Sequence, residues 1–446
     1  MADLLSIAQK VLGWARDDEH VEVVAVHDRD TEIRVYEGEI EQFTASESHG
    51  VGVRVIANDQ QGFAYAGTLD HEVLVETLAE ARDNATFGTS DEFLGLAEPD
   101  GVPLPSIELY DPGVSDMSTD DKIQLAIDLE AATRSADPRI CGIESSDYSD
   151  SIHQAALVSS SGVSVTSRES GSFVSVTALA QENDEMQIGF GFNVQRDPST
   201  IDINTAATDA ADRATRLLGA VQPPTERVTV LLDPFVTAQL LSIIGETLSG
   251  EAVLKGYSLF ANRLGDEVAA SSVTLIDDPT DTRMFTASQT DGEGLASRRN
   301  VLIDQGRLDM FVHNSYTARR AGTAATGSAV RSYSSVPGVG TRALQLVPGS
   351  TSQDDLIAEI DNGVLIQGVS GLHSGVNPVS GDFSTGAEGL RIRNGVVAEP
   401  VREITIASTL QRMLGDVRAV GNDTDWLPMA AAGVSVVIDD VTMSGS

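Results

Sequence analysis

Apolar and polar positions alternate near the start of the chain with the period of two that is typical of half-buried β-strands. Runs of this kind, rich in β-branched residues, predict strands at 21–27, 32–38 and 51–57. A return run at 62–67 follows Asn58-Asp59, a pair of turn-forming residues. The third and fourth runs therefore predict a β-hairpin.

Helical spacing of apolar residues alternates with these strands. It predicts helices at about 3–16, 71–84, 119–135 and 205–219, the second of them starting after Asp70. A second unit pairs the third helix with strands around 153–167 and 172–192, joined by Gly-rich turns. The fourth helix leads into VQPPTE at 221–226, and the two prolines make this stretch the best candidate for a domain boundary.

After Arg227 the pattern is mainly that of β-strands, with few helices. The long Gly-rich connector at 321–341 predicts either mobile loops or the wall of a groove. We therefore expect an α+β fold, with an N-terminal α/β lobe (1–220) and a mainly antiparallel β C-terminal domain (227–446) that carries a few helices. The N-terminal lobe has a candidate internal break near 100–118.

Composition narrows the class of protein. The length of 446 residues predicts two or three domains, and the hydrophobic content of 41% indicates that they are globular. No apolar run approaches the roughly 18 residues of a membrane span, and the first twenty residues are amphipathic, unlike a secretory signal. We therefore expect a soluble, cytoplasmic protein without a membrane partner.

The chain is strongly acidic, with a net charge of −38 and only three lysines, Lys10, Lys122 and Lys255. This charge disfavours nucleic acid as a partner, because phosphates need Lys and Arg for neutralisation. Scarce lysine with abundant acid is typical of a salt-loving organism or of a high-GC genome. The acidity thus concerns solubility more than activity.

Common catalytic motifs are absent from the sequence. There is no phosphate-binding P-loop, no complete dinucleotide fingerprint and no nucleophile elbow. No two of the seven histidines lie within six positions of each other, which excludes a helical two-histidine zinc site. His313 and His373 fit hydrogen-bonded structural roles better than catalytic ones, because spacing fixes no partner carboxylate.

Two further candidates have simple interpretations. Cys141 is the only cysteine, so the chain has no internal disulfide, and it is expected to be a small buried residue in a strand. The acidic pairs Asp277-Asp278 and Asp439-Asp440 are expected to be solvated surface at strand ends.

A helix is predicted directly after the strand-like run at 228–232. Asp233 supplies an N-cap carboxylate, and Pro234 stands at the first helical position, where its missing N–H costs nothing. The helix continues as AQLLSIIGETLSGE (238–251), a place where catalytic side chains are common, yet it carries little chemistry.

Several stretches together resemble the TldD/PmbA family of metallopeptidases, and specifically its PmbA (TldE) branch. They lie at 37–70, 277–322, 375–407 and 420–426, so the resemblance covers nearly the whole chain. The block NPVSGDFSTGAEG, followed by NG and PVREITIA, is the most specific part.

The resemblance implies an active-site helix without its site. TldD-type subunits carry a helical His-Glu-x-x-x-His zinc motif followed by Leu-x-Gly-Asp, which Leu248, Gly250 and Glu251 match. The two histidine positions then fall on Leu241 and Glu246, and the glutamate position on Ser242. The family also uses a late cysteine ligand, and this sequence has none after Cys141. We therefore expect no catalytic residue, metal or cofactor in this chain, with zinc in a partner subunit.

The resemblance further implies a non-catalytic subunit that pairs with a TldD-like zinc peptidase and helps form a cleft for extended or unfolded peptides. One alternative is a stand-alone homodimer that binds peptides without cutting them. Another is a self-sufficient hydrolase that uses Asp382 and His373. An adjacent gene that encodes His-Glu-x-x-x-His would favour the first interpretation.

The Gly-rich block at 375–389 is the candidate peptide groove. Its glycines allow close backbone approach, and Asn377, Ser380, Gly381 and Asp382 could satisfy the N–H and C=O groups of a bound peptide. The alternative is that these residues only close tight turns between strands.

Overall fold

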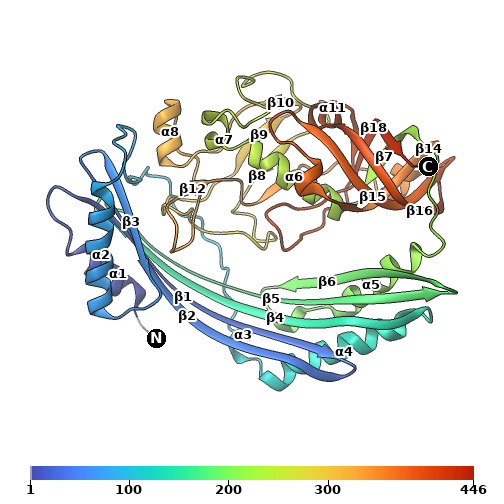
Figure 1. Cartoon of the computed structure of the whole chain (residues 1–446), viewed down its shortest axis with the longest axis horizontal. Coiled ribbons are helices and arrows are strands. Elements are labelled where there is room, and N and C mark those ends of the chain that lie inside the picture. The colour runs from blue at the N-terminus through green and yellow to red at the C-terminus, as the bar shows by residue number, and fades with distance from the viewer. Residues whose placement is uncertain (1–2, 446) are drawn as a thin grey trace.

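The computed structural model describes residues 3–445. One long antiparallel sheet of six strands, in the order β3-β2-β1-β4-β5-β6, forms the N-terminal half. Its strands are β1 (His20–Tyr36), β2 (Glu39–Ala57), β3 (Gln60–Ala66), β4 (Ile140–Ser159), β5 (Ser164–Glu182) and β6 (Glu185–Gln195). Figure 1 shows that this sheet is curved and that the C-terminal half of the chain lies over its concave side.

Helices cover the other face of this sheet in two separate places (Figure 1). They are α1 (Leu4–Leu12), α2 (His71–Thr86), α3 (Gly113–Asp116), α4 (Thr119–Ala136) and α5 (Ile203–Arg216), preceded by the short 3-10 helix η1 (Pro198–Thr200). Leu4 of α1 and Leu74 of α2 pack on Val23 in one apolar core, and Leu129 of α4 packs on Ile33 in another. The alternation along β1 thus anchors helices at both of its ends.

The predicted hairpin is confirmed. β2 and β3 pair antiparallel up to Ala57 and Gln60. Asn58 and Asp59 between them have positive φ values of 52° and 57°. This is the backbone of the two-residue turns that favour Asn and Asp in hairpins.

Several strand bounds were predicted wrongly, including those of the strand at 172–192, which contains the turn between β5 and β6 at 183–184. The runs at 21–27 and 32–38 are parts of one strand, because the polar residues between them pair with β2 on one side and β4 on the other. The predicted strand at 153–167 contains a turn at 160–163, and β5 runs without a break through Gly171. A Cβ on Gly171 would lie 2.3 Å from the Phe285 ring, so this glycine permits close packing and does not form a turn.

Cys141 lies in a strand as expected, but it is exposed, which corrects the prediction of a buried residue. The pairing of β4 with β5 skips it, since Ile140 faces Ala180 and Gly142 faces Leu179. A β-bulge therefore leaves Cys141 unpaired and turned away from the core.

The C-terminal half contains a second six-stranded sheet, in the order β16-β15-β14-β7-β18-β17, in which only β7 and β14 are parallel. Its strands are β7 (Glu226–Leu232), β14 (Asn362–Ser370), β15 (Asp382–Arg393), β16 (Val396–Thr409), β17 (Val417–Val420) and β18 (Val436–Ser444). Smaller sheets contain β8 (Leu275–Asp277), β9 (Asn300–Asp304), β10 (Arg307–Leu308) and β13 (Leu344–Leu346), and β11 (Ala329–Val330) with β12 (Gly338–Val339). The α+β fold class is confirmed.

The helices of this half are α6 (Pro234–Thr247), α7 (Gly250–Leu254), α8 (Ser315–Ala321), α9 (Gln353–Ala358), α10 (Leu372–Gly375) and α11 (Leu410–Gly415). One large apolar core joins α6 and α11 to the second sheet. Within residues 3–445, no helix is both long and apolar enough to span a membrane.

Candidate functional site

The helix that raised the question of a lost active site begins as predicted. Asp233 is its N-cap, and its Oδ1 accepts a hydrogen bond from the Val236 N–H at 2.9 Å. The Asp233 carboxyl is 5% exposed, and burial raises its pKa to about 6 although Arg213 lies 3.8 Å away. The start of α6 is therefore a buried acid that holds the first turn of the helix.

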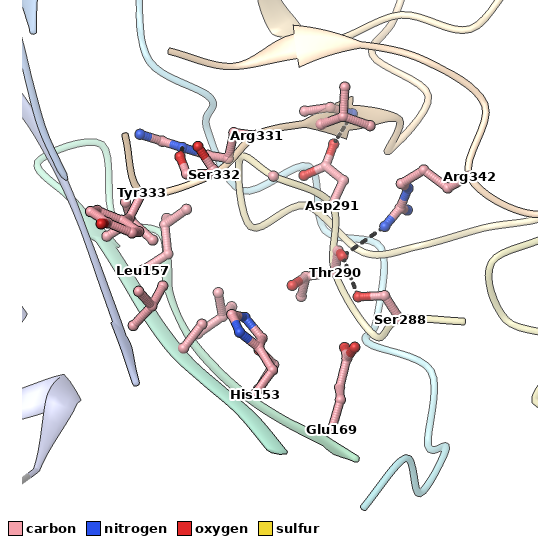
Figure 2. A pocket seen from close by; sticks show the side chains of 18 of the residues that line it. His153, Leu157, Glu169, Ser288, Thr290, Asp291, Arg331, Ser332, Tyr333 and Arg342 are labelled. Carbon is pink, nitrogen blue, oxygen red and sulfur yellow. Dashed lines mark hydrogen bonds between the residues drawn. The ribbon is translucent and has the colours of Figure 1, made fainter. Parts of the chain in front are cut away.

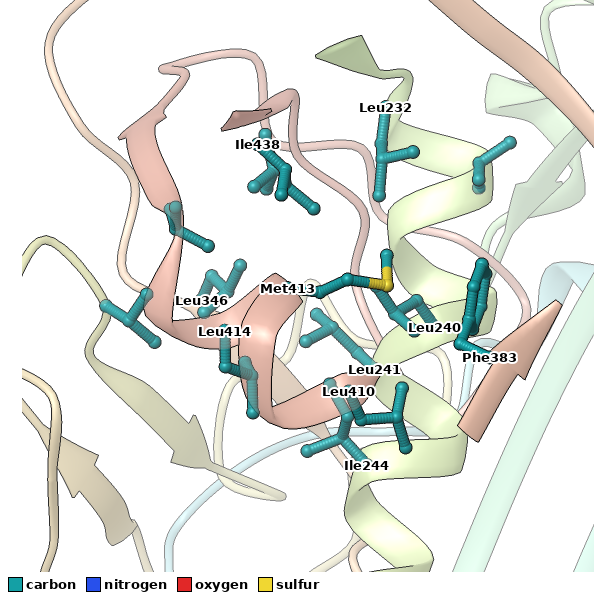
Figure 3. Close-up of a cluster of buried hydrophobic side chains, with 14 of the residues drawn as sticks. Leu232, Leu240, Leu241, Ile244, Leu346, Phe383, Leu410, Met413, Leu414 and Ile438 are labelled. Carbon is teal, nitrogen blue, oxygen red and sulfur yellow. The ribbon is translucent and has the colours of Figure 1, made fainter. Parts of the chain in front are cut away.

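Leu241, the first of the positions matched to the zinc motif, lies in the apolar core with 2% of its surface exposed. Figure 3 shows its side chain among Leu410, Met413 and Leu414 of α11. The Leu241 side chain is therefore shielded from solvent. A side chain at this position contributes packing.

The other two matched positions lie elsewhere on the helix. The Ser242 hydroxyl donates to the Ala238 carbonyl at 3.0 Å, and Glu246 is exposed. Positions 241 and 246 are five residues apart, so they point about 140° away from each other on a regular α-helix. Side chains at these positions could not share one ion unless the helix were distorted.

The residues that carry the match to Leu-x-Gly-Asp are held tightly. The Gly250 N–H donates to the Val312 carbonyl at 2.8 Å, and a Cβ on Gly250 would lie 2.2 Å from Nδ1 of His313. His313 is itself buried, its Nδ1 lies 3.2 Å from Thr317 Oγ1, and burial lowers its pKa. Glycine is thus required where the imidazole of His313 packs against the start of α7.

The block at 375–389 forms a tight turn that leads into β15. Asn377 Oδ1 accepts hydrogen bonds from the N–H groups of Val379 and Ser380, and the Ser380 hydroxyl donates to Asp382 at 2.7 Å. Gly381 has a φ of 83°, a conformation that favours glycine. These contacts have the geometry of the turn alternative, and contact with a peptide stays a prediction.

His373 and Asp382, the pair considered for a self-sufficient hydrolase, are both exposed. Among residues 3–445, no hydrogen bond joins them. The structure therefore places them near one turn without forming a dyad.

A cavity of about 510 Å³, here called the sheet cavity, lies between the two halves of the chain. One wall is the concave face of β1, β4 and β5, and the other consists of the loops 288–292 and 329–333 with Arg342. Figure 2 shows His153 and Glu169 extending from the sheet toward Ser288 and Thr290. The Gly-rich connector at 321–341 thus supplies part of a cavity wall, one of its two predicted roles.

An acid and a histidine from distant strands meet on the floor of the sheet cavity. His153 Nδ1 lies 2.5 Å from Asp28 Oδ1, although 125 positions separate the two residues in the chain. This hydrogen bond is the main cause of a raised pKa of His153. The pairing of β1 with β4 creates the contact, so no local signal in the sequence could have predicted it.

Buried ion pairs fix the loop 329–333 to the N-terminal sheet. Glu22 is bonded to Arg54 at 3.0 Å and also to Arg331, and all three side chains are at most 5% exposed. Burial acts to raise the pKa of Glu22, but the two guanidinium groups hold it below its usual value. A Cβ on Gly52 would lie 2.1 Å from the Tyr333 carbonyl oxygen, so the strand carries glycine where the loop crosses it.

Asp277 is fully buried, which corrects the prediction that it is solvated surface. Its Oδ1 accepts hydrogen bonds from the N–H groups of Arg342 and Ala343 at 2.8 and 2.7 Å, while burial raises its pKa. The neighbouring Arg342 side chain donates to Thr290 O at 2.9 Å. Asp277 at a strand end therefore positions Arg342 beside a cavity loop, a role that composition alone could not indicate.

A second cavity of about 510 Å³, here called the helix cavity, lies beside α6. Phe235 and Gln239 of α6, Arg213 of α5, Phe190 of β6 and Gln367 of β14 line it. The Phe190 and Phe235 rings lie 4.9 Å apart between centroids. The Oε1 atoms of Gln239 and Gln367 are buried and have no hydrogen-bond partner among residues 3–445.

Comparisons with known proteins agree on one family. Three domain models match, described as PmbA/TldA metallopeptidase domain 1 at 21–85, the central domain at 112–218 and the C-terminal domain at 225–445. Together they cover most of the chain. The protein belongs to the PmbA/TldD family.

Relatives from bacteria and archaea extend over nearly the whole chain. The Metalloprotease PmbA of Escherichia coli O157:H7 is 25% identical over 92% of this chain and 88% of its own length. A metalloprotease of Methanothermobacter thermautotrophicus is 28% identical over 91% and 88%. The crystal structure of TldE from Thermococcus kodakarensis has a TM-score of 0.87 at 22% identity, covering 99% of each chain. A Thermotoga maritima protein gives a TM-score of 0.90 at 24% identity, over 98% and 99%.

Proposed function

We propose that this chain is the non-catalytic subunit of a cytoplasmic heterodimeric peptidase, in which a TldD-like partner holds zinc and hydrolyses extended or unfolded peptides. The observation that carries the proposal is the set of side chains on α6 at the positions that the resemblance aligns with a zinc motif. Leu241 is buried among apolar side chains, Ser242 bonds to the helix backbone and Glu246 is exposed. Leu241 and Ser242 bring no imidazole or carboxylate, and the single carboxylate of Glu246 cannot hold zinc by itself.

The helix cavity supports a role in peptide binding. It lies against the same helix, and the unpaired amide oxygens of Gln239 and Gln367 could each accept an N–H from a bound peptide. Burying an acceptor without a donor costs free energy. A ligand that supplies the donors would recover that cost.

The experiment that tests the proposal compares each subunit alone with the pair. This chain is co-expressed with a TldD-like subunit from the same organism, and hydrolysis of unstructured peptides is measured for each subunit and for the purified complex. We expect a stable heterodimer, no hydrolysis by this chain alone, and more by the complex than by the partner. Chelator-sensitive hydrolysis by this chain alone would contradict the proposal.

The second candidate function is a homodimer that binds peptides without cutting them. The helix cavity favours it equally, since binding does not require zinc. Sedimentation of the isolated chain separates the two proposals. A stable homodimer that binds peptide and does not exchange subunits with the TldD-like protein would support this second function.

A further inference from the structure

Three side chains with metal-binding groups lie together on β1 and β2, outside both cavities. His27 on β1 is directly opposite His49 on β2, and Glu47 precedes His49 by two positions on the same strand. All three therefore project from one face of the sheet. Their ligand atoms lie within 4.8 Å of one another, and within residues 3–445 they are the only group of at least three His, Cys, Asp or Glu residues that meets this distance.

The contacts within this cluster, here called the His27 cluster, are close. His27 Nε2 lies 2.7 Å from Glu47 Oε1, and the rings of His27 and His49 are stacked with their centroids 4.4 Å apart. Two imidazoles and a carboxylate are thus already gathered at one point.

The cluster lies on the face of the sheet opposite the sheet cavity. Along β1, Val26 and Asp28 line the cavity, so His27 between them points the other way. On that face Ala25 belongs to the core under α1 and α2, and Ile33 to the core under α4. The cluster falls between these two cores, and the Glu47 side chain is 59% exposed. A metal ion could therefore reach it from solvent.

We propose that His27, Glu47 and His49 bind one divalent transition-metal ion of the zinc class, with a remaining coordination position open to water. Two imidazoles and one carboxylate suit zinc and its first-row neighbours, whereas calcium and magnesium prefer oxygen ligands alone. The site is separate from α6 and does not depend on the proposed peptidase role. It also revises the expectation of a chain without metal, which rested on the missing histidine pair of α6 and the missing late cysteine.

Metal binding requires a small rearrangement. Ligand atoms around tetrahedral zinc lie about 3.4 Å apart, given metal–ligand distances near 2.0–2.1 Å. Ligand atoms that lie up to 4.8 Å apart must therefore approach by roughly 1 Å, whereas His27 Nε2 and Glu47 Oε1, now 2.7 Å apart, must separate slightly. The stacked rings must also turn so that one nitrogen of each faces the ion. Glu47 is exposed and His49 is half-buried, so both have room to move.

The test uses the full-length chain without an affinity tag, stripped of metal with a chelator. Zinc affinity is measured by competition with a chromogenic chelator, and stoichiometry by elemental analysis after gel filtration. Cobalt(II) serves as a second probe, because its visible absorption reports nitrogen and oxygen coordination. We expect one ion per chain. His49→Ala and Glu47→Gln should each weaken binding at least as much as loss of a supporting shell does, roughly 10- to 100-fold.

The matched control is His373→Ala, which removes an exposed histidine of α10 in the other half of the chain. It should leave zinc affinity unchanged. Circular dichroism checks that each variant folds. If His49→Ala does not fold, Glu47→Gln still tests the proposal, because Glu47 is exposed and its replacement leaves no cavity in a core. A wild-type chain that binds no zinc at micromolar concentration, or variants that keep wild-type affinity, would overturn the proposal.

Discussion

Single residues of α6 contribute to stability in different ways. Leu241, which the family resemblance would align with a zinc ligand, is buried in the largest apolar core. Asp233, at the start of the helix, is also buried, but its carboxyl is polar and caps the first turn of the helix. Each of these residues makes a testable contribution to stability.

Asp233→Asn should change how stability depends on pH. In the folded chain, burial raises the pKa of Asp233 to about 6 from 3.8, so the folded state binds the proton more tightly. The wild type should therefore lose stability as pH rises from about 4 to 6, by about 3 kcal/mol at 1.36 kcal/mol per pKa unit. Asparagine is an equally good N-cap and does not ionise. Urea unfolding between pH 4 and 7 should show that the free energy of unfolding of the variant rises relative to that of the wild type as pH increases. The same pH dependence in both proteins would contradict this.

Leu241→His, Ser242→Glu and Glu246→His together should not create an efficient peptidase. The late ligand and the groups that orient the imidazoles are missing, and Leu241→His alone should cost about 2–5 kcal/mol, because it buries a polar imidazole without partners in an apolar core. Glu246→His alone, on the exposed side, is the matched control and should be close to neutral. Unfolding free energies and peptide hydrolysis with and without chelator measure both effects. Robust chelator-sensitive hydrolysis would contradict the expectation.

Secondary-structure elements could be predicted from the sequence where period and turn residues agree. The hairpin at Asn58-Asp59 and the start of α6 are examples, because local chemistry determines both. The continuity of β1 could not be predicted, since the polar stretch after His27 becomes a strand only when β2 and β4 pair with it. For the same reason the Asp28–His153 contact and the His27 cluster were invisible in the sequence, because each is formed by strand pairing.

Glu22→Gln tests the contact between β1 and the loop 329–333. It leaves Arg54 and Arg331 buried with less compensation, which should cost about 3–5 kcal/mol. Since the folded state lowers the pKa of Glu22, the wild-type stabilisation is present above the usual pKa of a glutamate and lost as pH falls through the lower folded value. The variant should not show this loss of stability at acidic pH. Glu399→Gln, which removes an exposed ion pair between β16 and Arg393 of β15, is the control and should leave urea unfolding nearly unchanged.

Asn377→Ala with Asp382→Ala separates the two roles of the turn before β15. The side-chain hydrogen bonds of the turn predict a loss of about 1–2 kcal/mol in the free energy of unfolding. The groove hypothesis predicts in addition that hydrolysis by the reconstituted heterodimer falls while pairing survives. Ser374→Ala, in the neighbouring α10, is the control for both measurements. Unchanged hydrolysis would assign the block to turn structure alone.

Across the whole molecule, the two halves are joined by more than the linker at 221–226. Arg331 and Arg319 of the C-terminal half bond to Glu22 and to the Phe93 carbonyl of the N-terminal half. The halves therefore enclose the sheet cavity in a fixed arrangement, while the helix cavity lies where α5 and β6 meet α6 and the second sheet.

The last prediction concerns the helix cavity, where a single variant should raise stability and lower peptide binding. Gln239→Met with Gln367→Met keeps the side-chain volume and removes two buried oxygens that lack a donor. The isolated chain should become more stable, by about 1–3 kcal/mol for each unsatisfied group removed. If those oxygens accept N–H groups from a peptide, the same variant should lower hydrolysis by the reconstituted heterodimer, because the bound chain loses two hydrogen bonds.

The control for that variant is Gln124→Met, a change of the same size on the exposed side of α4. It should alter neither urea unfolding nor hydrolysis. Sites that bind ligands commonly carry polar groups that are poorly satisfied in the free protein, so a rise in stability with a fall in hydrolysis would mark the helix cavity as such a site. A rise in stability with unchanged hydrolysis would mean that the peptide binds outside the helix cavity. A fall in stability would mean that the two amides already have donors in solution.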